Sequence, residues 1–250
     1  MGRAGKDPAR LLYGVEAILF DADGTLFDFQ RAERQALKEA MASFDLACDE
    51  AVHPAAYARI NRELWQQLEQ GRMTGTQLKV ERFRRFLDRL GASIAADAFS
   101  REYLLRLAQG TFLIDGAEDL LAAVRMRFKL AIVTNGLAEV QRPRLARSAI
   151  GSSFDTVVVS EEVGVAKPDV GIFRHALREL RHDDPSTVLM VGDSLESDIR
   201  GGIDAGMHTC WFNPSGLAND TAIEPTCEVA SLSELRDRLA DVSWPSASRS

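Results

Sequence analysis

Short apolar runs alternate with longer segments of helical periodicity over most of the chain. Four of the runs are rich in β-branched or large apolar residues and end at a polar or glycine-bearing turn, which is typical of buried strands. These runs are residues 15–20, 129–133, 156–160 and 188–191. A further strand is predicted to close at Cys210-Trp-Phe212.

Helical periodicity fills the intervals around these strands. The predicted helices cover residues 117–127, 137–148, 170–180 and 196–205. Regular alternation of strand and helix is typical of a parallel sheet with helices on both faces. The sequence therefore predicts an α/β fold with a doubly wound, mostly parallel sheet.

Residues 29–111 interrupt the alternation, because only helical periodicity runs through them. Apolar side chains recur there at helical spacing, at Leu64 and Leu68 and then at Leu78, Phe83, Phe86, Leu87 and Leu90. Structureless loops longer than about 15 residues are rare inside compact domains. We therefore expect an all-helical domain at 29–111, inserted into an α/β domain formed by residues 1–28 and 112–250.

Two features of the helical segment have ordinary structural explanations. Trp65 shares its helical spacing with Leu64 and Leu68, which predicts a core position. Four arginines accompany phenylalanines on one helix, and we expect them to form its solvated face. They are Arg82, Arg84, Arg85 and Arg89.

Composition excludes several classes of protein. Hydrophobic residues make up 46% of the chain and charged residues 27%, which is typical of a soluble globular protein. No apolar run approaches the roughly 18 residues that cross a bilayer, and residues 1–10 lack the apolar stretch of a secretory signal. Three scattered cysteines match neither a disulfide framework nor a metal knuckle, so we expect a reduced, cytoplasmic setting.

The net charge argues against nucleic-acid polymers and membranes as partners. The chain carries 30 lysines and arginines against 37 aspartates and glutamates, a net charge of −7. Binding to nucleic acid or to an acidic membrane surface requires a basic face. Any anion that this protein handles must therefore be bound by a local site.

Polar residues accompany the predicted strands at one end. In open α/β sheets, ligands bind beyond the carboxyl ends of the strands, and carboxylates, hydroxyls and one lysine follow these strands. They stand in Asp21-Ala-Asp23-Gly-Thr25, in Thr134-Asn135-Gly, in Lys167-Pro and in Gly192-Asp193 with Asp198. This set has the chemistry of a site for a divalent cation and a phosphate.

The charges of these groups suggest their roles. Asp21 and Asp193 offer the hard oxygen ligands that Mg²⁺ takes. Together with the Lys167 ammonium, Mg²⁺ would reduce the repulsion between a carboxylate nucleophile and a phosphate dianion. Asp21 and Asp23 can take different tasks if their surroundings separate their pKa values.

The remaining phosphate oxygens need hydrogen-bond donors. Thr134 and backbone N–H groups near Asn135 and Ala22 can supply them. Taken singly, each of these residues has an ordinary explanation as a turn, cap or surface residue. Four such signals in chain order, each after its own predicted strand, favour a functional site over coincidence.

These residues resemble the four motifs of the haloacid dehalogenase (HAD) superfamily. The aspartates at 21 and 23 with Thr25 resemble motif one, Thr134 motif two, Lys167-Pro motif three, and Gly192-Asp193 with Asp198 motif four. The helical insertion also stands where that superfamily carries its type-one cap. The resemblance implies an HAD-like Rossmannoid core with an inserted helical cap domain.

A narrower resemblance leads to the pyrimidine 5′-nucleotidase branch of this superfamily. It rests on residues 134–145, 160–168, 192–198 and 210–214, and on cap residues 64–83. Gly24 departs from that branch, which carries an acidic residue there. The resemblance implies a Mg²⁺-dependent phosphatase for a small phosphomonoester, above all a pyrimidine nucleoside 5′-monophosphate, with the 71–75 loop as our candidate for substrate selection.

The resemblance also implies residue roles in a two-step phosphoryl transfer. Asp21 attacks phosphorus and forms an aspartyl-phosphate. Asp23 protonates the leaving oxygen and then deprotonates the hydrolytic water, while its backbone carbonyl is a metal ligand beside Asp21 and Asp193. The other implied positions are Thr134, Asn135 and Lys167 for phosphate, with Thr25 and Asp198 in support.

Three other functions stay open on the sequence. In a 2-haloacid dehalogenase, the same first aspartate would attack a carbon atom, and Mg²⁺ would not be needed. Such enzymes lack a proton-donating aspartate at the position of Asp23, so the presence of Asp23 argues against this function. A sugar-phosphate phosphatase or phosphoglucomutase of the same superfamily shares every core motif, because specificity depends on the cap. A catalytically silent scaffold is disfavoured by the complete motif set.

Overall fold

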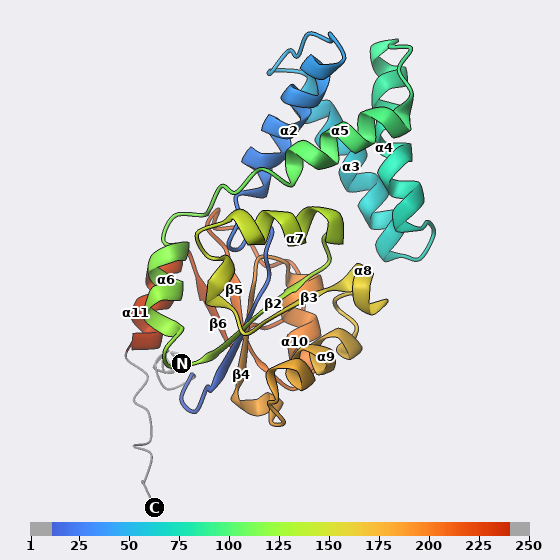
Figure 1. Ribbon diagram of the computed structural model, residues 1–250. Coiled ribbons are helices and arrows are strands. Elements are labelled where there is room, and N and C mark those ends of the chain that lie inside the picture. The colour runs from blue at the N-terminus through green and yellow to red at the C-terminus, as the bar shows by residue number, and fades with distance from the viewer. Residues whose placement is uncertain (1–11, 241–250) are drawn as a thin grey trace, which may run out of the picture. The chain divides into compact units, whose positions relative to one another are not determined.

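The computed structural model describes residues 12–240, which divide into two compact units (Figure 1). The α/β unit holds the chain up to Asp28, then Phe112–Ala138 and the chain from Leu145 onward. The helical unit holds Phe29–Thr111 with Glu139–Arg144. Residues 1–10, which lack the apolar stretch of a secretory signal, lie outside the described residues. No helix in the described part is long and apolar enough to cross a membrane.

The α/β unit is built on a parallel sheet that has six strands within the described residues. The strands are β1 (Ala17–Phe20), β2 (Lys129–Thr134), β3 (Thr156–Val159), β4 (Val188–Gly192), β5 (His208–Phe212) and β6 (Cys227–Val229). Their order is β3-β2-β1-β4-β5-β6, so the chain starts in the centre and winds outward in both directions. This doubly wound order confirms the predicted fold class and puts its switch point at β1.

The sheet has one strand more at one edge than the sequence predicts. β6 was not predicted, because three residues are too few for a periodic pattern to register. The predicted strands at 15–20 and 156–160 are shorter in the structure, whereas β2 and β4 each extend one residue further. Boundary shifts of this size are expected where strands pass into loops.

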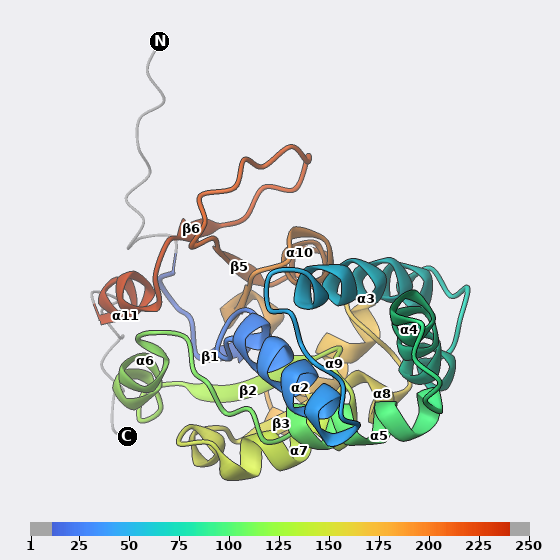
Figure 2. The same cartoon turned by 90° about the horizontal axis from the view of Figure 1, so that it is seen from above.

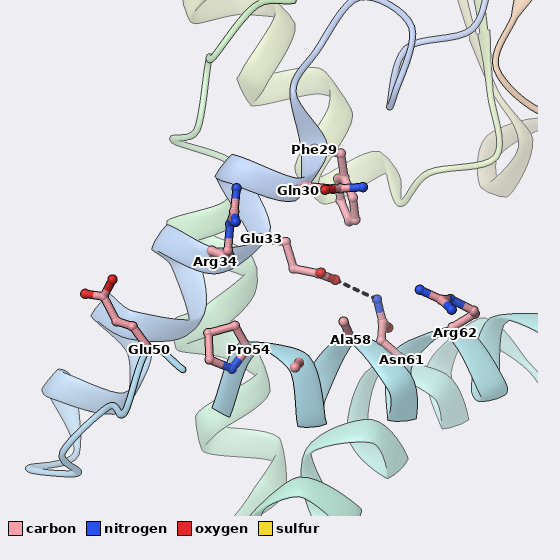
Figure 3. A pocket seen from close by; sticks show the side chains of 10 residues that line it. Phe29, Gln30, Glu33, Arg34, Glu50, Pro54, Ala58, Asn61 and Arg62 are labelled. Carbon is pink, nitrogen blue, oxygen red and sulfur yellow. Dashed lines mark hydrogen bonds between the residues drawn. The ribbon is translucent and has the colours of Figure 1, made fainter. Parts of the chain in front are cut away.

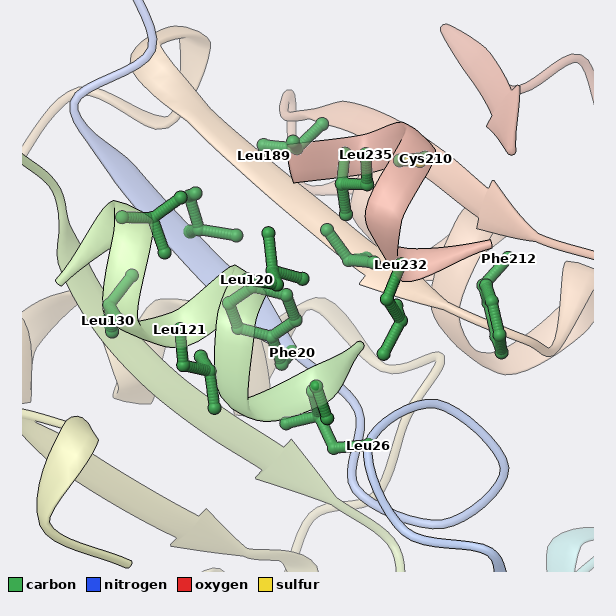
Figure 4. Close-up of a cluster of buried hydrophobic side chains, with 14 of the residues drawn as sticks. Phe20, Leu26, Leu120, Leu121, Leu130, Leu189, Cys210, Phe212, Leu232 and Leu235 are labelled. Carbon is green, nitrogen blue, oxygen red and sulfur yellow. The ribbon is translucent and has the colours of Figure 1, made fainter. Parts of the chain in front are cut away.

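Alternate residues of β1 enter different hydrophobic cores. Ile18 and Phe20 belong to a core with residues of α6 (Ala117–Val124) and α11 (Leu232–Ala240). Figure 4 shows Phe20 among the leucines of this core. Helices α6 and α11 lie side by side in the two overall views (Figures 1 and 2). Leu19 packs instead with residues of α9 (Val170–Leu180). Burial of each large apolar side chain contributes about 1.5–3 kcal/mol, which fixes the register of the central strand.

The predicted helix at 196–205 is wrong in detail. A π-helical segment, η3 (Leu195–Arg200), is followed by the short α10 (Gly201–Asp204). The carbonyl of Ser194 accepts hydrogen bonds from the N–H groups of both Asp198 and Ile199, which widens the first turn. The remaining short elements of the unit are α8 (Ser160–Val163), η1 (Gly151–Ser153) and η2 (Pro185–Thr187). Helix α7 (Ala138–Arg147) is divided between the units, since residues 139–144 group with the helical unit.

The helical unit contains α2 (Phe29–Ser43), α3 (His53–Glu69), α4 (Gly75–Leu90) and α5 (Ala96–Leu107). Thr74 begins α4 with a capping box, in which its side chain and that of Gln77 each bond the other's backbone N–H. Gly91 ends the helix in the left-handed conformation that glycine adopts readily. These local signals explain why α4 has sharply defined ends.

Aromatic rings form the interior of the helical unit. The Phe83 ring lies 5.2 Å from Tyr57, 5.1 Å from Phe99 and 4.8 Å from Tyr103, measured between ring centroids. All four side chains are fully buried. Aromatic pairs at such distances add about 0.5–1.5 kcal/mol each beyond the area that they bury, so Phe83 is the central contact of this core.

Two expectations for the helical segment are wrong. Arg82 does not join the exposed arginines, because its side chain is only 2% exposed. Its guanidinium lies over the rings of Phe83 and Tyr103, at 4.9 and 5.2 Å from the ring centroids, which offers cation–π contacts in place of water. Trp65 is half-buried rather than a core residue.

Replacement of Phe83 by alanine should strongly destabilise the helical unit. The lost ring leaves a cavity among three aromatic side chains, so we expect the free energy of unfolding to fall by about 3–5 kcal/mol. Urea denaturation followed by circular dichroism measures this. Val80→Ala on the same helix is the control, since Val80 is exposed, and equal effects of both changes would contradict the importance of the ring cluster.

Candidate active site

The carboxyl ends of β1, β2 and β4 form the rim on which the predicted residues gather. β1 pairs with both neighbours, so that Phe20 stands opposite Ile132 on one side and Val191 on the other. Asp21 follows directly, and its N–H donates to the carbonyl of Val191 at 2.9 Å. This hydrogen bond, at the carboxyl end of the β1–β4 pair, therefore holds the first aspartate at the switch point of the fold.

A buried ion cluster occupies this rim. Lys167 Nζ lies 2.5 Å from Asp21 Oδ1 and 2.7 Å from Asp198 Oδ1. All three side chains are buried, and Lys167 is only 3% exposed. Charges removed from water in this way are stable only when paired closely. The lysine therefore holds Asp21 from one side and is itself held from the other.

Burial and charge act in opposite directions on these groups. Burial raises the pKa of Asp21 well above its ordinary value, and the adjacent Lys167 ammonium opposes that rise. Burial disfavours the ammonium, but Asp198 and Asp21 outweigh this effect and raise the pKa of Lys167. The two carboxylates therefore favour the charged form of the lysine, which is placed where it can also meet an anionic ligand.

Three carboxylates are arranged as a cation site requires. Asp21, Asp193 and Asp198 each place an oxygen within 4.8 Å of the others. Burial by the surrounding protein and the charge of Asp198 raise the pKa of Asp193 to about 7, although its side chain keeps access to solvent. A cation bound there would favour the ionised form. The donor set is hard oxygen, which suits Mg²⁺.

Glycines make room for these carboxylates. At Gly24, a Cβ would stand 2.3 Å from Asp193 Oδ2, and at Gly192 a Cβ would stand 2.2 Å from Asp198 Oδ2. Gly24 also has φ of +87°, in the region that glycine adopts most readily. The departure of Gly24 from the nucleotidase pattern therefore has a local role, since it leaves space beside Asp193.

Neighbouring side chains fix the backbone of the site. The Asn135 amide bonds the main chain of Lys167 twice, accepting from its N–H at 2.8 Å and donating to its carbonyl at 2.9 Å. Asp198 Oδ2 accepts from the N–H of Ser194 at 3.1 Å. The indole N–H of Trp211 donates to the carbonyl of Asp193 at 2.9 Å. Sequence reasoning gave Trp211 no role in the site, although this residue stands in the fifth predicted strand and in the 210–214 segment that resembles the nucleotidase branch.

The other predicted residues lie on the same unit. Thr134 is buried at the end of β2, where its hydroxyl accepts from the N–H of Gly136 at 3.0 Å. Thr25 is buried, and its hydroxyl has no hydrogen-bond partner within the described part of the chain. Asp23 is half-buried, and its charge adds to the rise in the pKa of Asp193. The structure therefore brings Asp21 and Asp198 into direct contact with Lys167, places Thr134 at the end of β2, and places Asp23 and Thr25 on the loop after β1.

The fold and the site together define an enzyme class. A buried carboxylate beside a buried ammonium, with a cluster of hard oxygen ligands at the switch point of a doubly wound sheet, suits group transfer from an anionic substrate. Residues 15–206 match the model of the haloacid dehalogenase-like hydrolases, and the chain belongs to this family. The family resemblance inferred from the motifs is thereby confirmed.

Known proteins similar to this chain narrow the class further. It is 38% identical over 222 residues to the pyrimidine 5′-nucleotidase YjjG of Escherichia coli (strain K12), covering 89% of this chain and 96% of that protein. It is 35% identical over 223 residues to the pyrimidine 5′-nucleotidase PynA of Streptococcus pneumoniae, covering 89% and 94%. These relatives and the family confirm that the chain is a phosphoric monoester hydrolase of the HAD type.

A solved structure agrees with this assignment. The crystal structure of the putative HAD-hydrolase YfnB from Bacillus subtilis, bound to magnesium, has a TM-score of 0.84 to this chain. The two are 36% identical, and the match covers 90% of this chain and 98% of that one. A similar protein of this family thus binds magnesium, and the carboxylate cluster of this chain offers ligands of the type that magnesium prefers.

Replacement of Lys167 by methionine should abolish most phosphatase activity. The variant leaves carboxylates without their buried counter-charge, and we expect kcat/KM for p-nitrophenyl phosphate to fall at least about 10²-fold. Lys38→Met, at an exposed lysine of the helical unit, is the control. Retention of activity within tenfold by a folded Lys167→Met protein would contradict the role of the ion cluster.

Proposed function

We propose that this protein is a Mg²⁺-dependent phosphatase that hydrolyses pyrimidine nucleoside 5′-monophosphates through an aspartyl-phosphate on Asp21. The observation that carries the proposal is the 2.5 Å contact between Asp21 and the buried Lys167 ammonium. This contact uses Oδ1 of Asp21 and leaves Oδ2 for the reaction, and it keeps a positive charge beside the carboxylate. The names of the two nucleotidase relatives support the choice of substrate.

The residues that would hold Mg²⁺ are Asp21, Asp193 and the backbone carbonyl of Asp23. Their fit rests on the cluster of carboxylate oxygens and on the space that Gly24 leaves beside Asp193. When bound, the ion would neutralise charge on the phosphoryl group and orient it. Asp198 is the carboxylate of the cluster that stays with Lys167.

The first step joins Asp21 to phosphorus. A carboxylate oxygen of Asp21 forms the new bond while the bond from phosphorus to the nucleoside 5′-oxygen breaks. Asp23 gives its proton to that departing oxygen. Lys167 and Thr134, with the backbone N–H groups around Asn135, hold the other phosphoryl oxygens as charge develops on them.

The second step releases phosphate and restores the enzyme. Asp23, now ionised, takes a proton from water, whose oxygen bonds to phosphorus as the bond from Asp21 breaks. Thr25 and Asp198 support the site from behind the reacting groups. The helical unit would serve as the cap that excludes competing water during the reaction.

A panel of monophosphates tests the proposed substrate. We expect dUMP, dTMP and UMP to give higher kcat/KM values with Mg²⁺ than purine nucleotides or sugar phosphates, measured as released phosphate. EDTA should lower these rates at least about 10²-fold, and added Mg²⁺ should restore them. Halide release from a 2-chloro acid that EDTA does not affect, without phosphatase activity, would instead indicate a dehalogenase.

Amide variants test the two aspartate roles. Asp21→Asn should lower kcat for dUMP by at least about 10³-fold, because an amide is not a nucleophile. Asp23→Asn should lower kcat by about 10²–10⁴-fold and, with p-nitrophenyl phosphate, allow a phosphorylated protein to accumulate, which mass spectrometry detects. Asp183→Asn, at an exposed position, is the control. Full activity of either site variant would remove its assigned role.

A further inference from the structure

Two cysteines that take no part in the proposed chemistry stand opposite each other in the sheet. Cys210 of β5 and Cys227 of β6 are direct partners in the register of these parallel strands. Both side chains belong to the hydrophobic core that also contains Leu235 of α11 (Figure 4). The two thiols therefore extend from neighbouring positions on the same face of the sheet.

The spacing of the two strands suits a disulfide between them. Neighbouring strands lie about 4.8 Å apart, and the Cα atoms that a disulfide joins lie about 4.4–6.8 Å apart. Both cysteines are free, and their thiols share a hydrogen bond. Reciprocal bonds of 3.0 and 3.1 Å between Thr209 and Thr226 hold the strands together one residue before the pair. A sulfur–sulfur bond can therefore form here without a change of register.

The two thiols differ in their access to solvent. Cys227 lies on the edge strand of the sheet and is 8% exposed, whereas Cys210 is fully buried. A small oxidant can therefore reach the sulfur of Cys227 from outside, but it cannot reach that of Cys210. Any oxidation of the pair has to begin at Cys227.

The surroundings of Cys227 favour its thiolate, which is the reactive form of cysteine. The hydrogen bond from the Cys210 thiol, together with the Arg238 guanidinium of α11, lowers the pKa of Cys227 in spite of its burial. Glu234 accepts a hydrogen bond from Arg238 at 2.5 Å, and its charge opposes part of this effect. The shared hydrogen bond and burial raise the pKa of Cys210. Cys227 is thus suited to attack, while Cys210 stays protonated beside it.

The edge of the sheet is the place where a covalent bond would add most to the fold. Strand β6 has three residues and pairs only with β5 within the described residues. The two strands are joined by the long segment 213–226 (Figure 2). A disulfide that closes such a loop restricts the unfolded chain and so stabilises the folded one.

We propose that Cys210 and Cys227 are a reversible redox-modification site, at which a hydroperoxide converts the two thiols into a disulfide that ties β6 to β5. The site is separate from the proposed phosphatase chemistry. Dithiols return the pair to its reduced form by thiol–disulfide exchange.

The oxidation has two steps. The Cys227 thiolate attacks one oxygen of hydrogen peroxide, the O–O bond breaks, and a sulfenic acid forms while hydroxide leaves and takes up a proton. The Cys210 sulfur then attacks the Cys227 sulfur, its proton passes to the sulfenic oxygen, and that oxygen leaves as water. The two sulfurs lose two electrons and the peroxide gains them, so two thiols and one peroxide give one disulfide and two waters.

The test uses the full chain with Cys48→Ser, which keeps only the proposed pair of thiols. Cys48 is half-buried between α2 and α3. It lines a pocket with Glu50 and Pro54, two residues that Figure 3 shows. Its replacement prevents disulfides between chains through this thiol, and comparison with the wild-type chain shows whether Cys48 affects the pair.

Loss of alkylation measures the disulfide. Reduced Cys48→Ser protein, alkylated in urea, should carry a label on both cysteines. After treatment of the folded protein with hydrogen peroxide, we expect neither cysteine to be labelled, the chain to stay a monomer on non-reducing electrophoresis, and dithiothreitol to restore both labels. Retention of both thiols, or a disulfide between chains instead of within one, would overturn the proposal.

Single variants in the same background test the order of the steps. With Cys210→Ser, Cys227 should stop at the sulfenic acid, which dimedone in urea traps for mass spectrometry. With Cys227→Ser, we expect at least about tenfold less dimedone adduct, because Cys210 is buried and its thiol protonated. Equal labelling of the two variants would overturn the role of Cys227. Should a serine variant fail to fold, the loss of alkylation in Cys48→Ser protein still decides on the disulfide.

Thermal melting tests whether the disulfide fits the folded sheet. Oxidised Cys48→Ser protein should melt about 5 °C or more above its reduced form. Added Cys227→Ser should abolish this shift under the same treatment. A disulfide that forms only with a fall in melting temperature would overturn the proposed fit. None of these measurements uses phosphate release, so their failure and that of the proposed function are distinguishable.

Discussion

The buried ion cluster around Lys167 is the constraint on which the rest of the site depends. Removing an ammonium and two carboxylates from water costs several kcal/mol for each ion, and only close pairing recovers this cost. The contacts of 2.5 Å and 2.7 Å show that Lys167 has this pairing with Asp21 and Asp198. The same arrangement leaves the cluster with more negative than positive charge, since Asp193 stands beside it. The ion pairs therefore stabilise the buried charges, and the additional carboxylate leaves the site suited to binding a cation.

The sheet supplies the rigidity that this cluster requires. Asp21 and Lys167 are 146 positions apart in sequence, so no local structure can hold their atoms together. The backbone of Asp21 is fixed by its hydrogen bond to Val191 of β4. The backbone of Lys167 is fixed by Asn135, which follows β2. Hydrogen bonds that fix the backbone on both sides thus hold the two charged side chains within contact distance.

This dependence explains what the sequence could predict. Motif residues at strand ends were predicted to converge because parallel strands share one carboxyl edge, and Asp21 with Lys167 does so. Trp211 was missed because its indole bonds the carbonyl of Asp193, and a backbone acceptor leaves no trace in sequence. Arg82 was misassigned because helical periodicity places charged residues outside, whereas tertiary contacts with rings and with Asn61 hold this one inside.

The two units stabilise their buried positive charges in different ways. In the α/β unit, Lys167 pairs with two carboxylates, so its charge is compensated within the protein. In the helical unit, the Arg82 guanidinium gains one hydrogen bond to a neutral amide and two ring contacts. A well-packed apolar residue would stabilise that interior more. The Arg82 guanidinium therefore depends on the rings of Phe83 and Tyr103 for most of its contacts, so the aromatic core and the buried charge of the helical unit hold each other in place.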